Sequence, residues 1–205
     1  MSLFSLRNGL SLVVSLAVLV FATAAFAGPP TDFVKSKSET LFSIVNEDPG
    51  PARTTKLKKE ARTLVNYSIL AKRSLGKHWT ARSPEERKTF ISLLEELVEI
   101  NYADRFQQKA KDAKYKVDYL AEKVRESSKM AIVKTKVSYG KESFTLDYKL
   151  LNTKKGSTNS FIIFDTVFDD ISLEETYRAS YVPIIEKEGW ASLITRMENK
   201  LKESK

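Results

Sequence analysis

The stretch that decides this fold is residues 161–178, Phe-Ile-Ile-Phe-Asp-Thr-Val-Phe-Asp-Asp-Ile-Ser-Leu-Glu-Glu-Thr-Tyr-Arg. Its first half, Phe161 to Phe168, is apolar on both sides of a two-residue period, which predicts a strand that is covered on both faces. Ser172 with Glu175 three residues later is the pattern of a capping box, in which two side chains satisfy free N–H groups at a helix start. The stretch therefore predicts a strand, a tight turn and a helix in direct succession.

Three stretches before it have the period of strands with one buried face. Apolar and polar side chains alternate over residues 115–119, 131–139 and 144–150, so every second side chain points to the same face. Gly140-Lys141 and Lys154-Lys155-Gly156 fit hairpin connections, and successive strands should therefore pair antiparallel.

Helical periodicity occupies the chain before these strands. We expect Thr31 to cap a first helix, and apolar spacing predicts further helices from about residue 55 to 65 and from 68 to Gly76. Ser83-Pro84-Glu85-Glu86 combines a capping box with a proline at the first helical position. It should open the longest helix, which we expect to run to about residue 109. Asn101 within its apolar stripe is interpreted as satisfying a backbone group, with a ligand contact as the alternative.

Two helices should close the chain. Pro183 is expected to kink or interrupt the helix that begins at Ser172, because proline lacks an N–H and crowds the preceding turn. Gly189 should end that helix, and an amphipathic helix follows from Trp190 to Leu201. The order of helices, strands and closing helices predicts an α+β domain, with a curved antiparallel sheet of about four strands packed against several helices.

The first 27 residues have the parts of a secretory signal peptide. Arg7 supplies the basic start, Leu10 to Phe21 the apolar run, and Ala25-Phe26-Ala27 the small residues of a cleavage site. Because the apolar run is shorter than the roughly 20 residues that span a bilayer, we expect cleavage after Ala27 and not an anchor. Residues 28–205 should then form a single domain.

Composition limits what such an exported domain can do. The chain has no cysteine, so it has neither a disulfide nor a cysteine for lipid attachment. The net charge of +8 would suggest nucleic acid as the partner of a cytosolic protein, but export argues against nucleic acid. Anionic lipid headgroups or an acidic protein surface fit better, and a basic surface without a specific partner is the open alternative.

Catalytic and metal-binding patterns are scarce. The single histidine, His78, cannot form a histidine metal site, and without cysteine there is no cysteine nucleophile. A serine-histidine-acid triad through His78 is the alternative to simple packing beside Trp79. Asp165, Asp169 and Asp170 flank the turn before a helix, where carboxylates complement the helix N-terminus, so we interpret them as turn and cap residues. We predict no enzyme, no cofactor and no metal.

Two blocks carry a family resemblance. The strand-turn-helix resembles the signature of the MlaC or toluene-tolerance family, and its pattern is met at Asp165, Asp169, Ile171, Ser172, Leu173, Tyr177 and Arg178. The chain departs from that signature at three positions: Phe161 stands where a tryptophan is common, Asp170 replaces the turn glycine, and Thr176 replaces an asparagine. The second block, Leu75-Gly76-Lys77-His78-Trp79, agrees in order and spacing.

The resemblance implies a soluble, monomeric periplasmic protein that carries phospholipid between the inner and outer membranes. Its implied partners are an inner-membrane ABC-type lipid transport complex and an outer-membrane lipoprotein complex. The implied fold is cystatin-like or nuclear-transport-factor-like, with an apolar pocket between sheet and helices. On that basis the predicted lipid-binding residues are Leu93, Leu97, Tyr119, Val133, Val137, Phe144, Leu146, Tyr148 and Ile163.

Other functions remain open at this point. A related carrier could hold a hopanoid or a sterol-like molecule in the same pocket. The same apolar pattern could also fill an ordinary core, which would fit a secreted adaptor or structural protein. A small hydrolase of the same fold is the third class, and the scarcity of catalytic groups makes it the least favoured.

Overall fold

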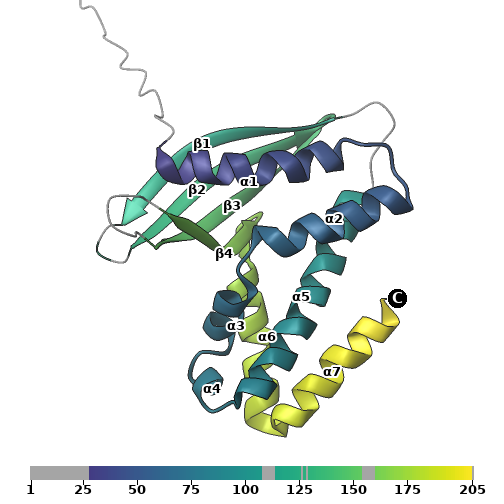
Figure 1. The fold of residues 1–205 in the computed structure, drawn as a ribbon, viewed down its shortest axis with the longest axis vertical. Helices are drawn as coiled ribbons and strands as arrows, with labels where there is room; N and C mark the ends of the chain where they lie inside the picture. Colours follow the sequence, from purple (N-terminus) through teal and green to yellow (C-terminus); the bar gives the residue numbers. More distant parts are fainter. Residues whose placement is uncertain (1–27, 108–113, 126, 128, 154–159, 205) are drawn as a thin grey trace, which may run out of the picture.

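The computed structural model describes residues 28–107, 114–125, 127, 129–153 and 160–204. Within them, an antiparallel sheet forms one end of the molecule, and helices extend away from it (Figure 1). The expected signal peptide, the second hairpin connection at 154–156 and the expected helix end at 109 lie outside the described residues.

The sheet has the order β1-β2-β3-β4-β5, and every neighbouring pair is antiparallel. Its strands are β1 (Tyr115–Arg125), β2 (Met130–Tyr139), β3 (Glu142–Asn152), β4 (Phe161–Phe168) and β5 (Ile171–Ser172). The four expected strands and their antiparallel pairing are confirmed, and the structure adds the short β5. Asp169 and Asp170 form the two-residue turn before β5, with φ of 44° and 64°, a left-handed conformation that aspartate tolerates.

One face of the sheet is closed by a helix. α1 (Pro29–Val45) lies across the strands (Figure 1) and packs against β1, β2 and β4. Cross-strand neighbours on this face form the core beneath it: Val133 is paired with Tyr148, and Leu150 with Ile163. These four side chains are at most 2% exposed, so they stabilise the domain by burial of apolar area.

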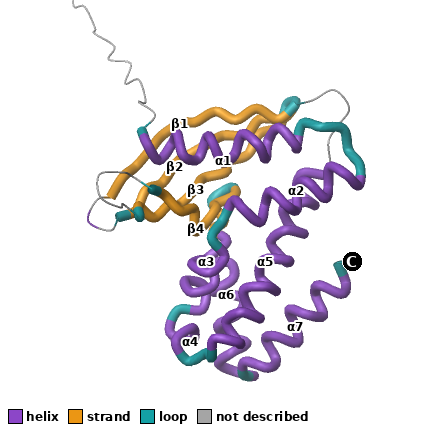
Figure 2. The backbone as a smooth tube through the Cα atoms, in the orientation of Figure 1, coloured by secondary structure: helices purple, strands orange, loops and turns teal. Residues whose placement is uncertain are grey.

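The remaining helices form a separate layer. They are α2 (Pro51–Leu64), α3 (Tyr67–Leu75), α4 (Lys77–Thr80), α5 (Pro84–Gln107), α6 (Leu173–Glu188) and α7 (Trp190–Glu203). Figure 2 shows the strands gathered at one end and α3 to α7 extending away from them. α5 packs against α2, α3 and α7, and α6 packs against α3 and α7.

The predicted helix starts are confirmed where the signal was local. Ser83 Oγ accepts from the backbone N–H of Glu86 (3.2 Å), and the carboxylate of Glu86 accepts from the N–H of Ser83 (2.8 Å). Ser172 Oγ likewise accepts from the N–H of Glu175 (3.2 Å). Gly189 ends α6 with a φ of 87°, a conformation that favours glycine.

Three helix expectations are corrected. Thr31 is not the N-cap of α1, which begins at Pro29 after Gly28; the carboxylate of Glu122 on β1 performs the capping instead. α2 begins at Pro51, earlier than expected, because proline suits a first helical position. Of the two outcomes expected of Pro183, interruption is wrong: α6 continues through it, and Pro183 lies on the exposed side, where water can bond the carbonyl that loses its partner.

Candidate functional site

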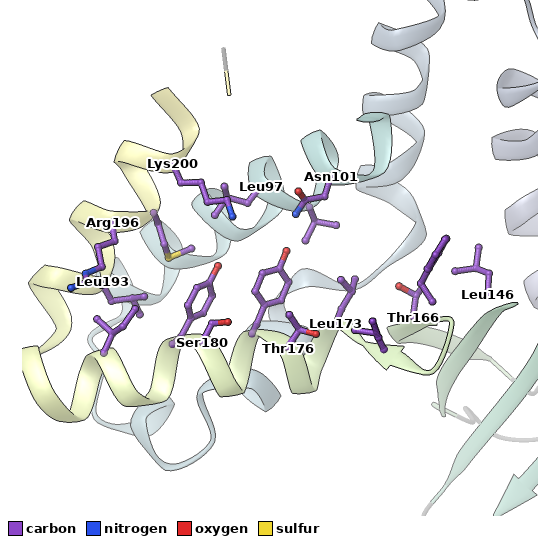
Figure 3. Close-up of a pocket in the computed structure, with 17 residues that line it drawn as sticks. Leu97, Asn101, Leu146, Thr166, Leu173, Thr176, Ser180, Leu193, Arg196 and Lys200 are labelled. Atoms are coloured by element: carbon purple, nitrogen blue, oxygen red, sulfur yellow. The ribbon is translucent and has the colours of Figure 1, made fainter. Parts of the chain in front are cut away.

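The described residues enclose a crevice between α5, α6 and α7 and residues of β3, β4 and β5 (Figure 3). Its volume is about 620 Å³, which lies within the range of about 300–1,000 Å³ that small-molecule sites occupy. Its walls are mainly apolar, formed by Leu97, Val98, Leu146, Phe168, Leu173, Tyr177, Tyr181, Ile184, Leu193 and Met197. The crevice can therefore take a ligand with a substantial apolar part.

Helical spacing places one wall of the crevice. The lining residues of α6 recur at three- and four-residue intervals: Leu173, Thr176, Tyr177, Ser180, Tyr181 and Ile184. α7 contributes a second stripe, Leu193, Arg196, Met197 and Lys200. Because residues at these intervals share one side of a helix, each helix turns a continuous stripe toward the crevice. Figure 3 shows Thr176 and Ser180 of α6 around the same space as Leu97 and Asn101 of α5.

The junction between β4 and α6 sets the direction in which α6 leaves the sheet. Asp165 is completely buried and accepts from the hydroxyl of Ser172 (2.6 Å) and the backbone N–H of Glu174 (3.0 Å). Its carboxylate also pairs with the ammonium of Lys149 on β3 (2.9 Å). These contacts tie the start of α6 to two strands, so Asp165 acts as the cap residue that the sequence predicted.

A second buried carboxylate ties α6 to α3. Glu174 is 5% exposed and accepts from the guanidinium groups of Arg73 (2.6 Å) and Arg178 (2.7 Å). Arg178 also donates to the backbone carbonyl of Arg73 (2.6 Å). The family-signature residues Asp165, Ser172 and Arg178 therefore position the wall of the crevice and do not line it.

Aromatic side chains pack against one another in the crevice wall. Tyr177 and Tyr181 stack with ring centroids 5.2 Å apart, and Phe90 meets Tyr181 edge to face at 5.8 Å. Burial raises the pKa of the Tyr181 phenol well above its ordinary value, so this side chain stays neutral at physiological pH. Tyr181 therefore presents an uncharged surface to a ligand.

Polar and cationic side chains occupy the rim. Asn101, Thr176, Ser180, Arg196 and Lys200 are all exposed residues of the crevice lining. Arg196 is paired with Glu188 at 2.7 Å. The pKa of Glu188 is lowered, chiefly by a hydrogen bond from Ser192 and also by Arg196. The crevice thus combines an apolar interior with hydroxyl, amide and cationic groups at its mouth.

Two of the nine predicted lipid-binding residues, Leu97 and Leu146, line this crevice. Val133, Val137, Tyr148 and Ile163 belong to the hydrophobic core and are at most 2% exposed, while Leu93, Tyr119 and Phe144 pack partly buried against it. Tyr119 hydrogen-bonds Ser38 of α1 (2.8 Å), and Phe144 stacks on the lining residue Phe168 at 4.7 Å. The structure therefore does not place the seven other residues in the crevice.

The prediction missed the contributions of α6 and α7. A usable signal was present, since Leu173, Tyr177 and Tyr181 are four residues apart and Leu193 and Met197 repeat that spacing. That periodicity identifies an apolar stripe, but it does not show whether the stripe meets a packed neighbour or an open space. Asn101, interpreted as a backbone partner, lies exposed at the crevice mouth.

The described residues contain no group of three or more histidine, cysteine or acidic side chains that could hold a metal ion. His78 Nε2 lies 3.2 Å from the carboxylate of Glu186 on α6. The pKa of Glu186 is lowered by hydrogen bonds from Lys77 and His78.

Among the helices described, none is long and apolar enough to cross a membrane.

Fold and crevice together define an α+β protein with an open apolar binding crevice and a polar, cationic rim. The chain belongs to the MlaC family, whose sequence model, described as MlaC protein, matches residues 35–199. It is similar to the intermembrane phospholipid transport system binding protein MlaC of Haemophilus influenzae, with 24% identity over 97% of this chain and 95% of the relative.

A solved structure shares the fold. The phospholipid-binding protein of Ralstonia solanacearum, determined in complex with a phospholipid, superposes with a TM-score of 0.71 at 16% sequence identity. The match covers 84% of this chain and 97% of the Ralstonia protein. The expected α+β architecture and the family resemblance are both confirmed by these comparisons.

Proposed function

We propose that this protein is a periplasmic phospholipid carrier that holds acyl chains in the crevice and leaves the headgroup at its mouth. The observation that carries the proposal is the apolar crevice of about 620 Å³ with a cationic rim, found in a chain of the MlaC family. The names of the Haemophilus and Ralstonia relatives, which refer to phospholipid transport and phospholipid binding, support it.

Solvation energies explain why a carrier needs such a crevice. Transfer of a methylene from an apolar environment to water costs about 0.8 kcal/mol of free energy, so exposing an acyl chain of about fifteen methylenes would cost about 12 kcal/mol. Walls formed by Leu97, Leu193 and Met197 replace the apolar contacts that the chain makes in a bilayer. Transfer between membrane and protein then becomes nearly balanced.

The rim sets the orientation of the ligand. A phosphate cannot enter the apolar interior without losing its hydration, whereas the guanidinium of Arg196 and the ammonium of Lys200 attract it at the mouth. The hydroxyl of Ser180 can donate to the same group. The headgroup would therefore lie between α6 and α7, with the acyl chains directed toward Leu146.

Transport direction must come from other proteins, because the sequence has no nucleotide-binding motif. The proposed partners are an inner-membrane ABC-type complex and an outer-membrane lipoprotein complex, and cleavage after Ala27 would release the exported protein into the periplasm. The proposal assigns binding and no catalysis. The buried carboxylate of Asp165 is already engaged by Lys149, Ser172 and the N–H of Glu174.

The test is lipid extraction from protein purified out of the periplasm of a Gram-negative host. Mass spectrometry should find glycerophospholipid in the wild-type protein, and Ser180→Trp, which places an indole in the crevice, should remove most of it. Ala179→Trp is the matched control, because this neighbouring exposed position is not part of the lining. A hopanoid or sterol in the extract would show that the carrier holds that lipid and not a glycerophospholipid. A wild-type protein without lipid would overturn the proposal in favour of an adaptor.

A further inference from the structure

The start of α1 is held by a carboxylate from the sheet. Oε2 of Glu122 on β1 accepts from the backbone N–H of Thr31 (2.9 Å), the hydroxyl of Thr31 (2.6 Å) and the backbone nitrogen of Gly28 (3.2 Å). No side chain of α1 itself caps this helix. One residue on β1 therefore satisfies free donors of a helix start that lies more than ninety positions earlier in the chain.

Gly28 is also the residue that follows the predicted cleavage site. We propose that removal of the signal peptide converts this contact into an ion pair between the new α-ammonium of Gly28 and Glu122, which fastens the mature N-terminus to the sheet. This proposal rests on the export step of the proposed function. A signal peptidase adds water across the Ala27–Gly28 bond: Ala27 leaves with the carboxylate, and the Gly28 nitrogen becomes an amine that takes up a proton.

Cleavage changes the strength of the contact and leaves its partners in place. Before cleavage the Gly28 nitrogen is a neutral amide donor, whereas afterwards it is a charged group with three donors. The bond to the ionised carboxylate is charge-assisted before cleavage, and afterwards both partners are charged, so direct Coulomb attraction between them is added. A cation at a helix N-terminus is otherwise unfavourable because of the helix dipole, and the Glu122 carboxylate offsets that repulsion.

Space explains why glycine occupies this position. The backbone of Gly28 is extended, with a φ of −96°, so its conformation does not require glycine. A Cβ atom built on Gly28 would instead overlap the Glu122 carboxylate. Any larger residue would therefore displace the carboxylate from the nitrogen, even if the peptidase cleaved before it.

The surroundings leave room for a hydrated ammonium. Pro29, Pro30 and Glu122 line a second cavity of about 450 Å³, which also contains the cationic residues Arg125 and Lys129. Asp32 lies in the first turn of α1. These are the charged residues of the first turn and of this cavity, and Glu122 is the one that contacts the Gly28 nitrogen in the described structure.

The experiment measures the reactivity of the α-amino group in protein purified from the periplasm. Intact mass should first show that the chain begins at Gly28. A trace acylating reagent is then applied across pH values, and the N-terminal peptide is quantified by mass spectrometry. A free α-amino group has a pKa of about 7.7–8.0. A carboxylate partner at this distance favours the ammonium and raises that pKa, so acylation at neutral pH should be slower than for an unpaired amine, by about severalfold.

Three variants separate the ion pair from other causes. Glu122→Gln keeps an acceptor for Thr31 but removes the charge, so the acylation rate should rise to that of an unpaired amine. Gly28→Ala should be cleaved at the same bond and also react faster, because its methyl group displaces the carboxylate. Glu142→Gln, at the exposed β2–β3 hairpin, is the matched control and should react like the wild type.

Thermal unfolding gives an independent readout with a defined sign. A raised pKa of an amine stabilises the folded state below the unfolded-state pKa, and this contribution is lost as pH rises through the folded-state pKa. The Tm of the wild type should therefore be higher than that of Glu122→Gln, and this difference should be larger at pH 6.5 than at pH 10. An exported chain that begins elsewhere, or equal acylation of both proteins, overturns the proposal. Neither readout depends on lipid, so its failure is distinct from that of the carrier function.

Discussion

Replacement of Asp165 by alanine should destabilise the domain more than any change at the neighbouring turn. Its carboxylate is completely buried, accepts two hydrogen bonds from the start of α6, and pairs with Lys149. Alanine leaves the Ser172 hydroxyl, the Glu174 N–H and the Lys149 ammonium without this acceptor. Removal of one partner from a buried, hydrogen-bonded charge pair typically costs about 3–5 kcal/mol.

Urea unfolding followed by circular dichroism measures this loss. With a slope of about 2 kcal/mol per molar urea, the midpoint should fall by about 1.5–2.5 M. Asp165→Asn keeps an amide oxygen that can accept from one of the α6 donors, so its cost should be less than half that of alanine. Lipid content should fall with stability, because the same junction aims α6 along the crevice.

Asp170→Asn is the matched control. Asp170 is exposed in the adjacent turn, and asparagine also tolerates its positive φ of 64°, so the change should stay within about 0.5 kcal/mol. If Asp165→Ala were as stable as Asp170→Asn, the reasoning that this carboxylate holds the strand-to-helix junction would be refuted.

Two further predictions concern the helical layer. Trp79 is 8% exposed, and the guanidinium of Arg87 lies 5.2 Å from its ring centroid, so Trp79→Ala should cost about 3–5 kcal/mol in urea unfolding; an unchanged midpoint would contradict its packing role. The pKa of Glu95 is raised, first by burial and then by repulsion from Glu99. Ionised Glu95 therefore destabilises the folded protein at pH values above its folded-state pKa, whereas below the unfolded-state pKa of 4.5 the side chain is protonated in both states and has no such effect. Glu95→Gln should therefore raise the Tm at pH 7 and not at pH 3.5, whereas an equal gain at both pH values would point to a different cause.

Features set by neighbours in the sequence were predictable. The helix starts at Ser83 and Ser172 and the glycine at 189 depend on residues within a single turn. The structure contains the reciprocal capping box of Ser83 and Glu86, the bond from the Glu175 N–H to Ser172 Oγ, and Gly189 at the end of α6. Strand alternation also predicted which side chains of β2 are buried, since Ala131, Val133 and Val137 share the closed face. Burial on one face of a strand follows from its two-residue period alone.

Features set by distant contacts were not predictable in this way. Threonine is a residue type that often caps helices, but the backbone N–H and the hydroxyl of Thr31 both donate to Glu122, which lies on a strand far along the chain. Proline usually breaks a helix, yet the exposed position of Pro183 lets α6 continue. In both cases the local signal was real, and its outcome depended on which side of the helix faced the rest of the molecule.

The site shows the same division. Apolar periodicity identified long stripes on the sheet and on α5, and the resemblance implied a pocket between sheet and helices. Periodicity shows which side chains avoid water, but a filled core and an open crevice satisfy that condition equally. Leu97 and Leu146 were found because they lie where the stripes of α5 and β3 reach the space beside α6 and α7.

By itself, the amino-acid sequence determined the α+β class, the antiparallel meander, the main helix starts and the family, because each of these depends on short-range patterns that a single segment carries. Only the tertiary structure decided that α1 closes the sheet face over Val133 and Tyr148, that Glu122 caps α1, and that the crevice opens between α5, α6 and α7. The physical reason is that a cavity is a relation between surfaces that are far apart in the chain. Their separation is set by buried anchors such as Asp165 and Glu174, which direct the path of α6 away from the sheet.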